Sequence, residues 1–274
     1  MSRIFFAEFR RLFHFRLFYI ECAAVILYSL IVSIVSGPSV VDSFLYYIMI
    51  VAGAFSAVCA SQFIGTEYSC GAIRNKLATG HTRTGIYLAQ FILQILATVI
   101  LFHLSILTIV ITAAIFDWIY YFSFRILLGY YFACICTIIC ITAISVFVSM
   151  LNSSNLTSLV VLLALYVGLS MTGSNFHSAL REQEMRMADT LQTENSTEEN
   201  FADERVRKGF EYLLLINPYG QAAYESMPVF ESHGEYRQLR ILENPLPKIF
   251  LFSAVESLGL TAVGISAFKK KEIK

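Results

Sequence analysis

The residues with the most distinctive types and spacing lie in a polar, basic stretch at 65–87, between two long apolar runs. If residues 67–77 form a short helix, Glu67, Gly71 and Arg74 align on one face at i, i+4 and i+7. A neighbouring apolar stripe is formed by Cys70, Ile73 and Leu77. Charged hydrogen-bonding groups beside an apolar stripe could hold a soluble partner, and we interpret the stretch as a docking surface. The alternative is a solvated loop whose basic residues only fix its side of a membrane.

Three ionisable side chains fall within apolar runs, where such groups are costly and by default mark functional sites. Glu256 lies well inside the last run, and we expect a substrate-path or interhelix polar role, with a protonated packing residue as the alternative. Glu21 lies near the inner end of the first run, where it could pair with Arg16 or reach towards the interface. His103 is expected to make an interhelical hydrogen bond rather than to bind a metal, and no metal site is predicted.

The composition excludes a soluble globule. Of the 274 residues 57% are hydrophobic and 15% charged, with a mean hydropathy of +0.64, so polar surface is too scarce to coat such a fold. Apolar runs long enough to cross a bilayer core of about 30 Å as helices recur along the chain. They are Phe18–Val35, Phe44–Ile64, Ile86–Phe116, Ile126–Leu151, Leu156–Thr172 and Ile249–Phe268. The third run exceeds one crossing, so we expect its first turns, with Gln90 and Gln94, to project into the cytoplasm.

Basic residues indicate on which side each connecting segment lies. The N-terminus, the 65–87 stretch and the C-terminal tail hold four, three and four Lys or Arg residues, whereas the two short connections of opposite parity hold only Arg125. Both termini are therefore predicted to be cytoplasmic in a multi-pass protein of the cell (plasma) membrane. No cleavable signal peptide is expected, because the N-terminus lacks a small-residue cleavage site.

Residues 1–17 are predicted to form an amphipathic helix in the membrane interface. On a helical wheel one side is apolar and carries Phe5, Phe6, Phe9, Leu12, Phe13 and Leu17. The other side is polar and carries Arg3, Arg10, Arg11 and His14. The alternative is a basic anchor that only follows the positive-inside pattern.

The predicted fold class is an all-α polytopic membrane protein with six transmembrane helices, an N-terminal amphipathic interfacial helix and a large extracellular segment between helices five and six. The organisation is an interfacial helix at 1–17, helices one to five at 18–172 with a cytoplasmic loop at 65–87, an extracellular segment at 173–248, helix six at 249–268 and a cytoplasmic tail at 269–274. The part at 181–208 is strongly charged and is expected to be a solvated helix or loop. Residues 209–227 are apolar and aromatic and are expected to fold back against the outer face of the membrane. No cysteine lies in the extracellular segment, so no disulfide framework is expected.

The sequence EYSCGAIRNKLATGHTR resembles the cytoplasmic loop between the second and third helices of type-2 ABC transporter permeases, the transmembrane subunits of bacterial ABC exporters. In that family the pattern E-Y-x-x-G-T-I-R-x-x-L-x-x-G-x-x-R forms a coupling helix that a cleft in the ATPase receives. The matching residues are Glu67, Tyr68, Gly71, Ile73, Arg74, Leu77, Gly80 and Arg83. Ala72 replaces the usual Thr, and Gln90 stands where a basic residue is common. In addition, LLLINPYGQAAY at 213–224 is similar to the Asn-Pro-containing exterior segment of such permeases.

The resemblance implies a permease subunit that moves an amphipathic or hydrophobic substrate, peptide or drug-like, outward. No G-x-x-x-x-G-K-[ST] loop is present, so ATP and Mg are expected on a partner ATPase and no cofactor on this chain. The implied partners are two copies of an ABC ATPase subunit, a second permease copy in a homodimer, and membrane lipid, with no nucleic acid. Small residues spaced by four could support that dimer or packing within one protomer: Gly53, Ala57 and Ser61, and Ala164 and Gly168.

A non-transporting membrane sensor or pore that uses the exterior segment to capture a ligand is the alternative function. An intramembrane enzyme is less favoured, because H-E-x-x-H, G-x-S-x-G and paired intramembrane acids are lacking.

Overall fold

The computed structural model describes residues 2–36, 44–116, 124–192, 197–223 and 246–272, and all regular structure in these ranges is helical. The helices are α1 (Ser2–Leu12), α2 (Arg16–Ser36), α3 (Phe44–Ser69), α4 (Ala72–Ala78), α5 (Arg83–Ile115), α6 (Phe124–Leu151), α7 (Asn155–Gln192), α8 (Thr197–Ile216) and α10 (Leu246–Lys270). A further helical stretch occupies 218–223. The all-α class is thus confirmed for the described residues.

Five of these helices are long and apolar enough to cross a membrane: α2, α5, α6, α7 and α10. The predicted second span corresponds to α3, a helix of 26 residues that is not among the five. The five spans were identified among the described residues alone, and the side chains at the beginning of α3 lie outside them. The protein is therefore a multi-pass helical membrane protein, and the count of six spans is not confirmed.

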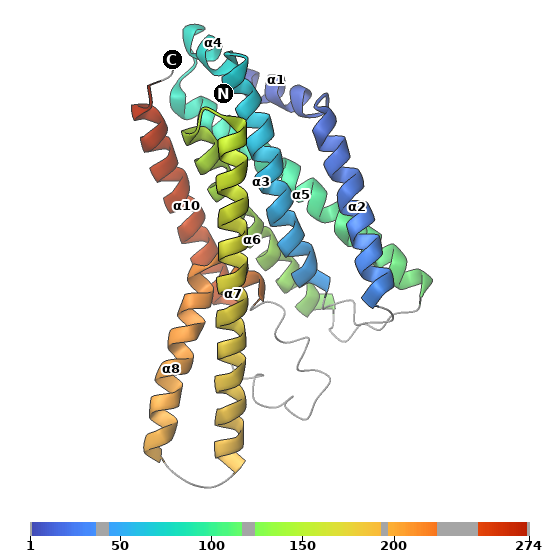
Figure 1. Cartoon of the computed structure of the whole chain (residues 1–274), viewed down its shortest axis with the longest axis vertical. Coiled ribbons are helices and arrows are strands. Elements are labelled where there is room, and N and C mark those ends of the chain that lie inside the picture. Colours follow the sequence, from blue (N-terminus) through green and yellow to red (C-terminus); the bar gives the residue numbers. More distant parts are fainter. Residues whose placement is uncertain (1, 37–43, 117–123, 193–196, 224–245, 273–274) are drawn as a thin grey trace.

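Three helices, α3, α5 and α6, form the centre of the bundle (Figure 1). Around them, α2 packs on α5 and α3, α10 packs on α6 and α5, and α7 packs on α3. The short helices α1 and α4 lie at one end of the bundle, together with the C-terminal end of α10 (Figure 1). At the opposite end α7 and α8 project beyond the other helices as a hairpin.

The prediction that the fifth apolar helix ends at Thr172 is wrong, because α7 continues without a break to Gln192. Residues 174–192 contain no proline or glycine and several strong helix formers, so the helix gains by continuing as a polar extension. Position 173, inside this helix, is occupied by glycine, and the neighbouring backbone leaves no room there for a side chain. A Cβ at this position would lie 2.8 Å from the backbone nitrogen of Gly220.

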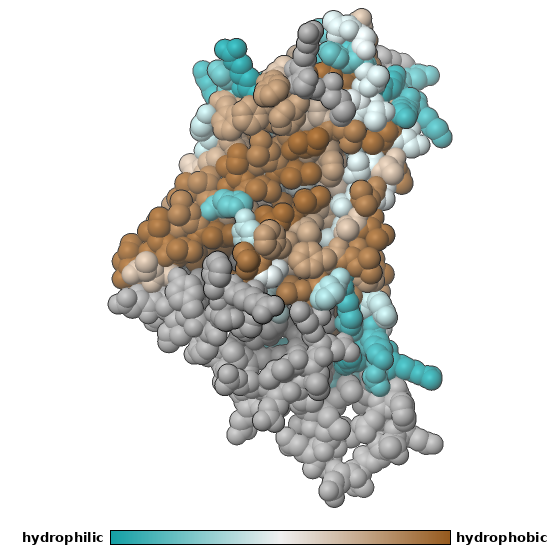
Figure 2. Space-filling model, turned by 180° about the vertical axis from the view of Figure 1, so that it is seen from behind, coloured by the Kyte–Doolittle hydropathy of each residue, from teal (hydrophilic) through white to brown (hydrophobic). Residues whose placement is uncertain are grey.

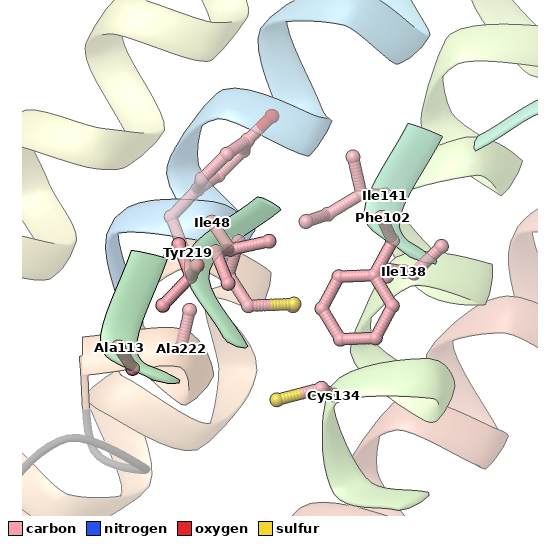
Figure 3. Close-up of a cluster of buried hydrophobic side chains, with 10 residues drawn as sticks. Ile48, Phe102, Ala113, Cys134, Ile138, Ile141, Tyr219 and Ala222 are labelled. Carbon is pink, nitrogen blue, oxygen red and sulfur yellow. The ribbon is translucent and has the colours of Figure 1, made fainter. Parts of the chain in front are cut away.

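The main apolar core joins the helical stretch 218–223 to the central helices (Figure 3). Tyr219 and Ala222 of this stretch pack in one cluster with Ile48 of α3, Phe102 of α5 and Ile138 of α6. On the face seen in Figure 2, a broad band of apolar side chains covers the middle of the bundle, and polar residues gather at the upper end and along the lower right edge. This distribution is the one expected where lipid covers the middle of the protein.

Candidate functional site

Residues 67–77, which were predicted to form a single helix, are divided between the end of α3 and the separate helix α4. Helix α3 continues through Glu67 and ends at Ser69, and α4 begins only at Ala72. Gly71 separates them with φ of 70°, a left-handed conformation that glycine adopts without steric cost. Its N–H donates to the carbonyl of Tyr68 at 3.1 Å and so helps to close the end of α3. The alignment of Glu67 with Arg74 on one helical face is therefore wrong.

A second glycine ends α4. Gly80 has φ of 87°, its N–H donates to Leu77 O at 3.0 Å, and the N–H of His81 donates to Lys76 O at 3.1 Å. These two bonds define a Schellman motif, in which a left-handed glycine satisfies the last carbonyls of a helix. Helix α5 then begins after Thr82, whose hydroxyl accepts a hydrogen bond from Gly85 N at 3.1 Å. Glycine and threonine thus hold α4 as a short, separate helix at the tip of the bundle.

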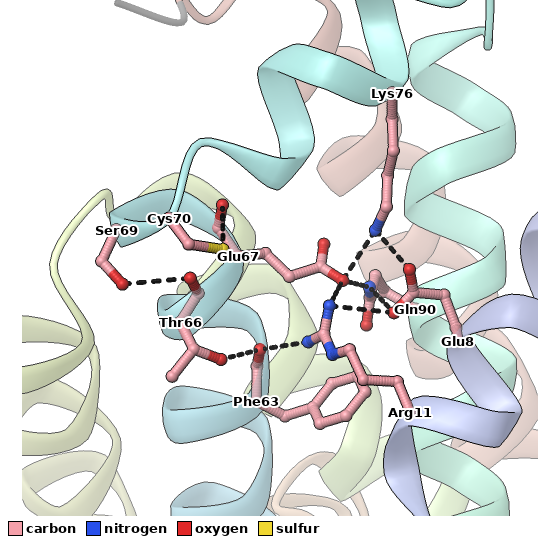
Figure 4. A network of polar contacts seen from close by, with 9 residues as sticks. All are labelled: Glu8, Arg11, Phe63, Thr66, Glu67, Ser69, Cys70, Lys76 and Gln90. Atoms are coloured by element: carbon pink, nitrogen blue, oxygen red, sulfur yellow. Dashed lines mark hydrogen bonds and ion pairs between the residues drawn. The ribbon is translucent and has the colours of Figure 1, made fainter. Parts of the chain in front are cut away.

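Glu67 is fully buried at the end of α3, and its Oε1 atom accepts hydrogen bonds from three other helices (Figure 4). The donors are Arg11 of α1, Lys76 Nζ of α4 at 2.6 Å and Gln90 Nε2 of α5 at 2.8 Å. Glu8 of α1 joins them through Lys76 Nζ at 2.5 Å and Arg11 Nη1 at 3.2 Å. We refer to these five residues as the Glu67 cluster. Its two carboxylates face two cations, which makes burial of all four groups tolerable.

The electrostatics of the two acids differ. Burial raises the pKa of Glu67, and the hydrogen bond to Glu8 adds to this effect while the nearby charge of Lys76 opposes it. For Glu8 burial acts in the same direction, but the hydrogen bond from Glu67 and the charge of Lys76 outweigh it and lower the pKa. Glu67 is therefore the acid of this pair that takes up a proton first as the pH falls.

The apolar stripe predicted to face a partner is only partly available on the surface. Ile73 is 1% exposed and packs with Ile64 of α3 and Ile86 of α5, and Leu77 packs against the same cluster. Cys70 is exposed, but it precedes α4. The stripe faces inward because the turn at Gly71 changes the direction of the chain. The solvent-facing side of α4 is formed instead by Arg74, Asn75 and Ala78.

Other matching residues of the loop bind the ends of α6 and α10. Tyr68 Oη donates to Met150 O at 2.5 Å, and Lys271 Nζ donates to the same carbonyl at 3.1 Å while lying 3.9 Å from the Tyr68 ring centroid. Arg83 donates to Phe268 O at 2.8 Å and also to Lys271 O. A cation at the C-terminal end of a helix is favourable because it satisfies the last carbonyls. Partial burial lowers the pKa of Lys271 to about 8.

Helix α1 keeps Arg10 exposed as predicted, but it also has a buried side. Ile4, Glu8 and Leu12, spaced by four, form a buried side, and α1 packs on α5. Arg11 was predicted on the solvated side, but Arg11 Nη2 donates to Phe63 O at 2.8 Å. The wheel alone could not reveal this, because the attraction of Arg11 to Glu67 comes from a helix distant in sequence. The exposed side includes Phe6 and Phe13, which fits contact with lipid.

Glu256 belongs to a second polar group, inside the bundle. Its Oε2 atom accepts hydrogen bonds from Cys140 Sγ of α6 at 3.2 Å and from Gln221 Nε2 at 3.1 Å. Gln221 is fully buried; its Nε2 also donates to Leu215 O at 2.6 Å, and its Oε1 accepts from Ser253 Oγ of α10 at 2.6 Å. Gln221 therefore joins the 218–223 stretch to α10. These residues are called the Gln221 network.

The sequence NPYG at 217–220 explains how this stretch turns back into the bundle. Asn217 Oδ1 accepts the N–H of Tyr219 at 3.0 Å, and Pro218 occupies the first helical position, where no donor is needed. Asn217 Nδ2 also donates to Leu169 O of α7 at 2.7 Å. Residues 209–216 belong to the long helix α8, and 218–223 enter the helix bundle. That the segment 209–227 lies against the outer face of the membrane stays a prediction, and its part at 224–227 lies outside the described residues.

The other two ionisable residues of the apolar runs differ in their surroundings. His103 Nδ1 donates to Val99 O at 2.7 Å, so Nε2 is left to contact Tyr131 Oη of α6, also at 2.7 Å. His103 is thus an interhelical hydrogen-bonding residue. Glu21 is 5% exposed, and neither of its oxygens has a hydrogen-bond partner among the described residues. The predicted pairing of Glu21 with Arg16 is not found, because Arg16 is exposed.

Sequence reasoning missed several residues of these sites: Glu8, Lys76, Lys271 and Gln221. Lys76 follows Arg74 by two residues in a basic loop, which gives no local signal of burial, and neither does an acid on an amphipathic helix. Gln221 was the exception, since a glutamine directly after NPYG in an apolar stretch could have indicated a buried hydrogen-bonding role. Within the described residues no group of His, Cys, Asp or Glu is arranged to hold a metal, and the six cysteines are free thiols.

A bundle of apolar helices, closed at one end by a short helix between two left-handed glycines, defines a multi-pass membrane protein with a separate polar tip. The family model for the ABC-2 family transporter protein matches residues 9–273, and the chain belongs to this family. It is an ABC-2 type permease, and membership implies partnership with an ABC ATPase. No curated protein matches the chain.

Proposed function

We propose that the chain is the membrane subunit of an ATP-driven exporter, in which α4 receives the movement of a separate ATPase. The observation that carries this proposal is the family match over 9–273 combined with the position of α4. The helix exposes Arg74, Asn75 and Ala78 at the tip of the bundle, and its opposite side is fixed to the protein by Ile73 and Lys76. A partner that pushes on the exposed side moves the buried side with it.

The polar contacts at this end give the movement two routes into the bundle. The Glu67 cluster joins α4 to α1, α3 and α5. Glu67 belongs to α3, and its Oε1 atom accepts hydrogen bonds from α1, α4 and α5. Tyr68 and Arg83, which flank α4, bind the carbonyl ends of α6 and α10. The interior of a protein is close-packed and nearly incompressible. A displacement of α4 therefore shifts the packed helices from one discrete arrangement to another.

The topology follows from the same arrangement. We place α4, α1 and both termini in the cytoplasm and count α3 as the sixth span, which agrees with the basic residues at this end. The α7–α8 hairpin then lies outside the cell.

The proposed second permease copy is supported by small exposed residues on α7. Ala164 and Gly168 are exposed one turn apart, and nothing lies within 4 Å of a Cβ built at Gly168. The other small-residue row is used within the protomer, since Gly53 packs against Tyr219 and Ala57 is buried.

The outward-moving substrate is an amphipathic or hydrophobic molecule, because the spans are apolar and aromatic and the Gln221 network offers a few hydrogen-bonding groups at one depth. ATP and Mg bind the partner ATPase. The sensor or pore alternative is less favoured, because it gives no reason for the contacts that tie α4 to α1, α3 and α5 through the Glu67 cluster.

The proposal is tested by expressing the permease with an ABC ATPase encoded beside it and purifying through a tag on the permease. We expect the ATPase to co-purify, and its ATP turnover in liposomes to change when an amphipathic peptide or lipophilic cation is added. Absence of both co-purification and a substrate effect on turnover would favour the sensor or pore. If the ATPase co-purifies but no added compound changes its ATP turnover, the proposed substrate class is contradicted, whereas the proposed contact between α4 and the ATPase is not.

A further inference from the structure

A polar ridge runs along α5 from the Glu67 cluster into the apolar interior. Gln90, Gln94 and Thr98 occur at i, i+4 and i+8, which places them on one side of the helix, and each is 0% exposed. That the first turns of this helix, with Gln90 and Gln94, project into the cytoplasm stays a prediction, but both side chains face the interior of the protein. Leu93 and Ala97, which flank Gln94 in the sequence, pack with Phe63 of α3.

Four polar atoms in this region are buried without a hydrogen-bond partner in the described part of the protein. They are Glu67 Oε2, Gln90 Oε1, Gln94 Oε1 and Gln94 Nε2. The next residue of the ridge ends the series, because Thr98 Oγ1 donates to Gln94 O at 2.9 Å and accepts from Thr142 Oγ1 at 3.4 Å. The residues that carry these atoms are neighbours, since Gln90 Nε2 is bonded to Glu67 Oε1 at 2.8 Å and Gln94 follows Gln90 by one helical turn.

Leaving such atoms without partners is expensive. Each buried polar atom without a hydrogen bond carries the full cost of its desolvation, and no lipid group could reach a position that is enclosed on all sides. Leucine at position 94 would fill a similar volume at no such cost. Buried groups of this kind in proteins are normally satisfied by bound water, which makes about three hydrogen bonds. Side chains one turn apart are about 5–6 Å from each other at Cβ, a separation that a bridging water spans.

We propose that a file of bound water molecules lies between α3 and α5, from Glu67 Oε2 past Gln90 to Gln94. The ligand class is water itself, held by one carboxylate oxygen and two side-chain amides. The proposal does not depend on the partner ATPase. Bound water would also help α4 to move. Water exchanges hydrogen-bond partners readily, so it can solvate the charged groups of the Glu67 cluster when their ion pairs separate. Without it, the separated charges would lie unsolvated in an apolar core.

The test is radiolytic hydroxyl labelling of the full-length protein in nanodiscs, carried out in ¹⁸O-labelled water and read by mass spectrometry. Radicals form from water in contact with a side chain, so a buried ring beside bound water is labelled and a buried ring in a dry core is not. Phe63 and Phe102 are compared because both are 0% exposed and they belong to different clusters. Phe63 packs with Leu93 and Ala97 beside Gln94 in the sequence, whereas Phe102 lies one turn beyond Thr98, where the series of unpartnered atoms has ended. We expect labelling of Phe63 to exceed that of Phe102 several-fold. Equally low labelling of the two rings would overturn the proposal.

A variant provides the second measurement. Gln94→Leu removes two of the polar atoms that hold the file and should reduce the labelling of Phe63 several-fold. Ser105→Ala, three turns further along α5 at another buried polar position, should leave it unchanged. Undiminished labelling of Phe63 in a folded Gln94→Leu protein would mean that the label came from transient opening, and the file would be rejected. Should Gln94→Leu fail to fold, the comparison of Phe63 with Phe102 in the unmodified protein decides alone.

Discussion

Lys76 Nζ of α4 lies 2.6 Å from Glu67 Oε1 of α3, and this contact is part of what holds the short helix against the bundle. Replacing Lys76 by methionine keeps most of the packing but leaves two acids facing one cation. We expect a loss of stability on the order of 2 kcal/mol, because one partner of a buried ion pair is removed. The melting temperature in nanodiscs measures it. An unchanged melting temperature would show that Arg11 alone satisfies both acids.

Arg74 should behave in the opposite way. Its side chain is exposed on α4, so Arg74→Ala is expected to change the free energy of unfolding by no more than about 0.5 kcal/mol and to leave the melting temperature almost unchanged. If the exposed side of α4 contacts the ATPase, the same change should weaken ATPase binding by tenfold or more, the value of a lost charged hydrogen bond of about 1.5–3 kcal/mol. Lys269→Ala, another exposed cation at this end, is the control. Equal effects of the two changes would argue for general charge attraction instead of docking at α4.

Glu67 should make stability depend on pH. Since its pKa rises from 4.5 to about 7 on folding, the folded state keeps a proton that the unfolded state has released. The contribution of Glu67 to the free energy of unfolding therefore falls as the pH rises from about 4.5 to about 7 and is constant above that. Glu8, with a lowered pKa, titrates below this window. Glu67→Gln should show a flatter pH dependence of the melting temperature, and an identical slope would count against the assignment.

The Gln221 network gives a prediction for transport. Glu256→Gln keeps an oxygen that can accept from Cys140 and Gln221, so we expect a folded protein with altered transport. Glu256→Leu leaves both donors without an acceptor, at a cost of about 1–3 kcal/mol for each, and should be worse in both stability and transport. The measurement is substrate uptake into inverted vesicles beside the melting temperature. Full transport by Glu256→Leu would remove any functional need for the carboxylate.

The proposed topology can be tested with thiol reagents that do not cross membranes. In a Cys70→Ser background, a cysteine introduced at Arg205 of α8 should be labelled in intact cells, and one introduced at Lys270 should react only after the cells are opened. Both positions are exposed in the protein, so accessibility to solvent does not confound the result. Labelling at Lys270 in intact cells, or protection at Arg205, would reverse or reject the proposed orientation.

The sequence determined the class of the protein and the position of the loop. Apolar runs predict helices because a chain in lipid must satisfy its own backbone, and the beginnings of α3, α6 and α7 fall within two residues of the predicted ones. Gly71 and Gly80 were identified as matches to the family pattern, and both have positive φ, although Gly71 was expected inside a helix and lies in a turn. The end of α7 was missed, since a helix continues past the apolar run wherever its polar residues favour helix.

Only the tertiary structure decided which side chains of the loop face inward. A turn at Gly71 rotates α4 relative to α3, so Ile73 enters the core and Arg74 stays outside, although the sequence had placed both on a docking surface. The partners of Glu67 come from α1, α4 and α5, and those of Glu256 from α6 and the 218–223 stretch. Hydrogen bonds between residues far apart in the chain depend on how helices cross, and the periodicity of one helix carries no information about the charges on its neighbours.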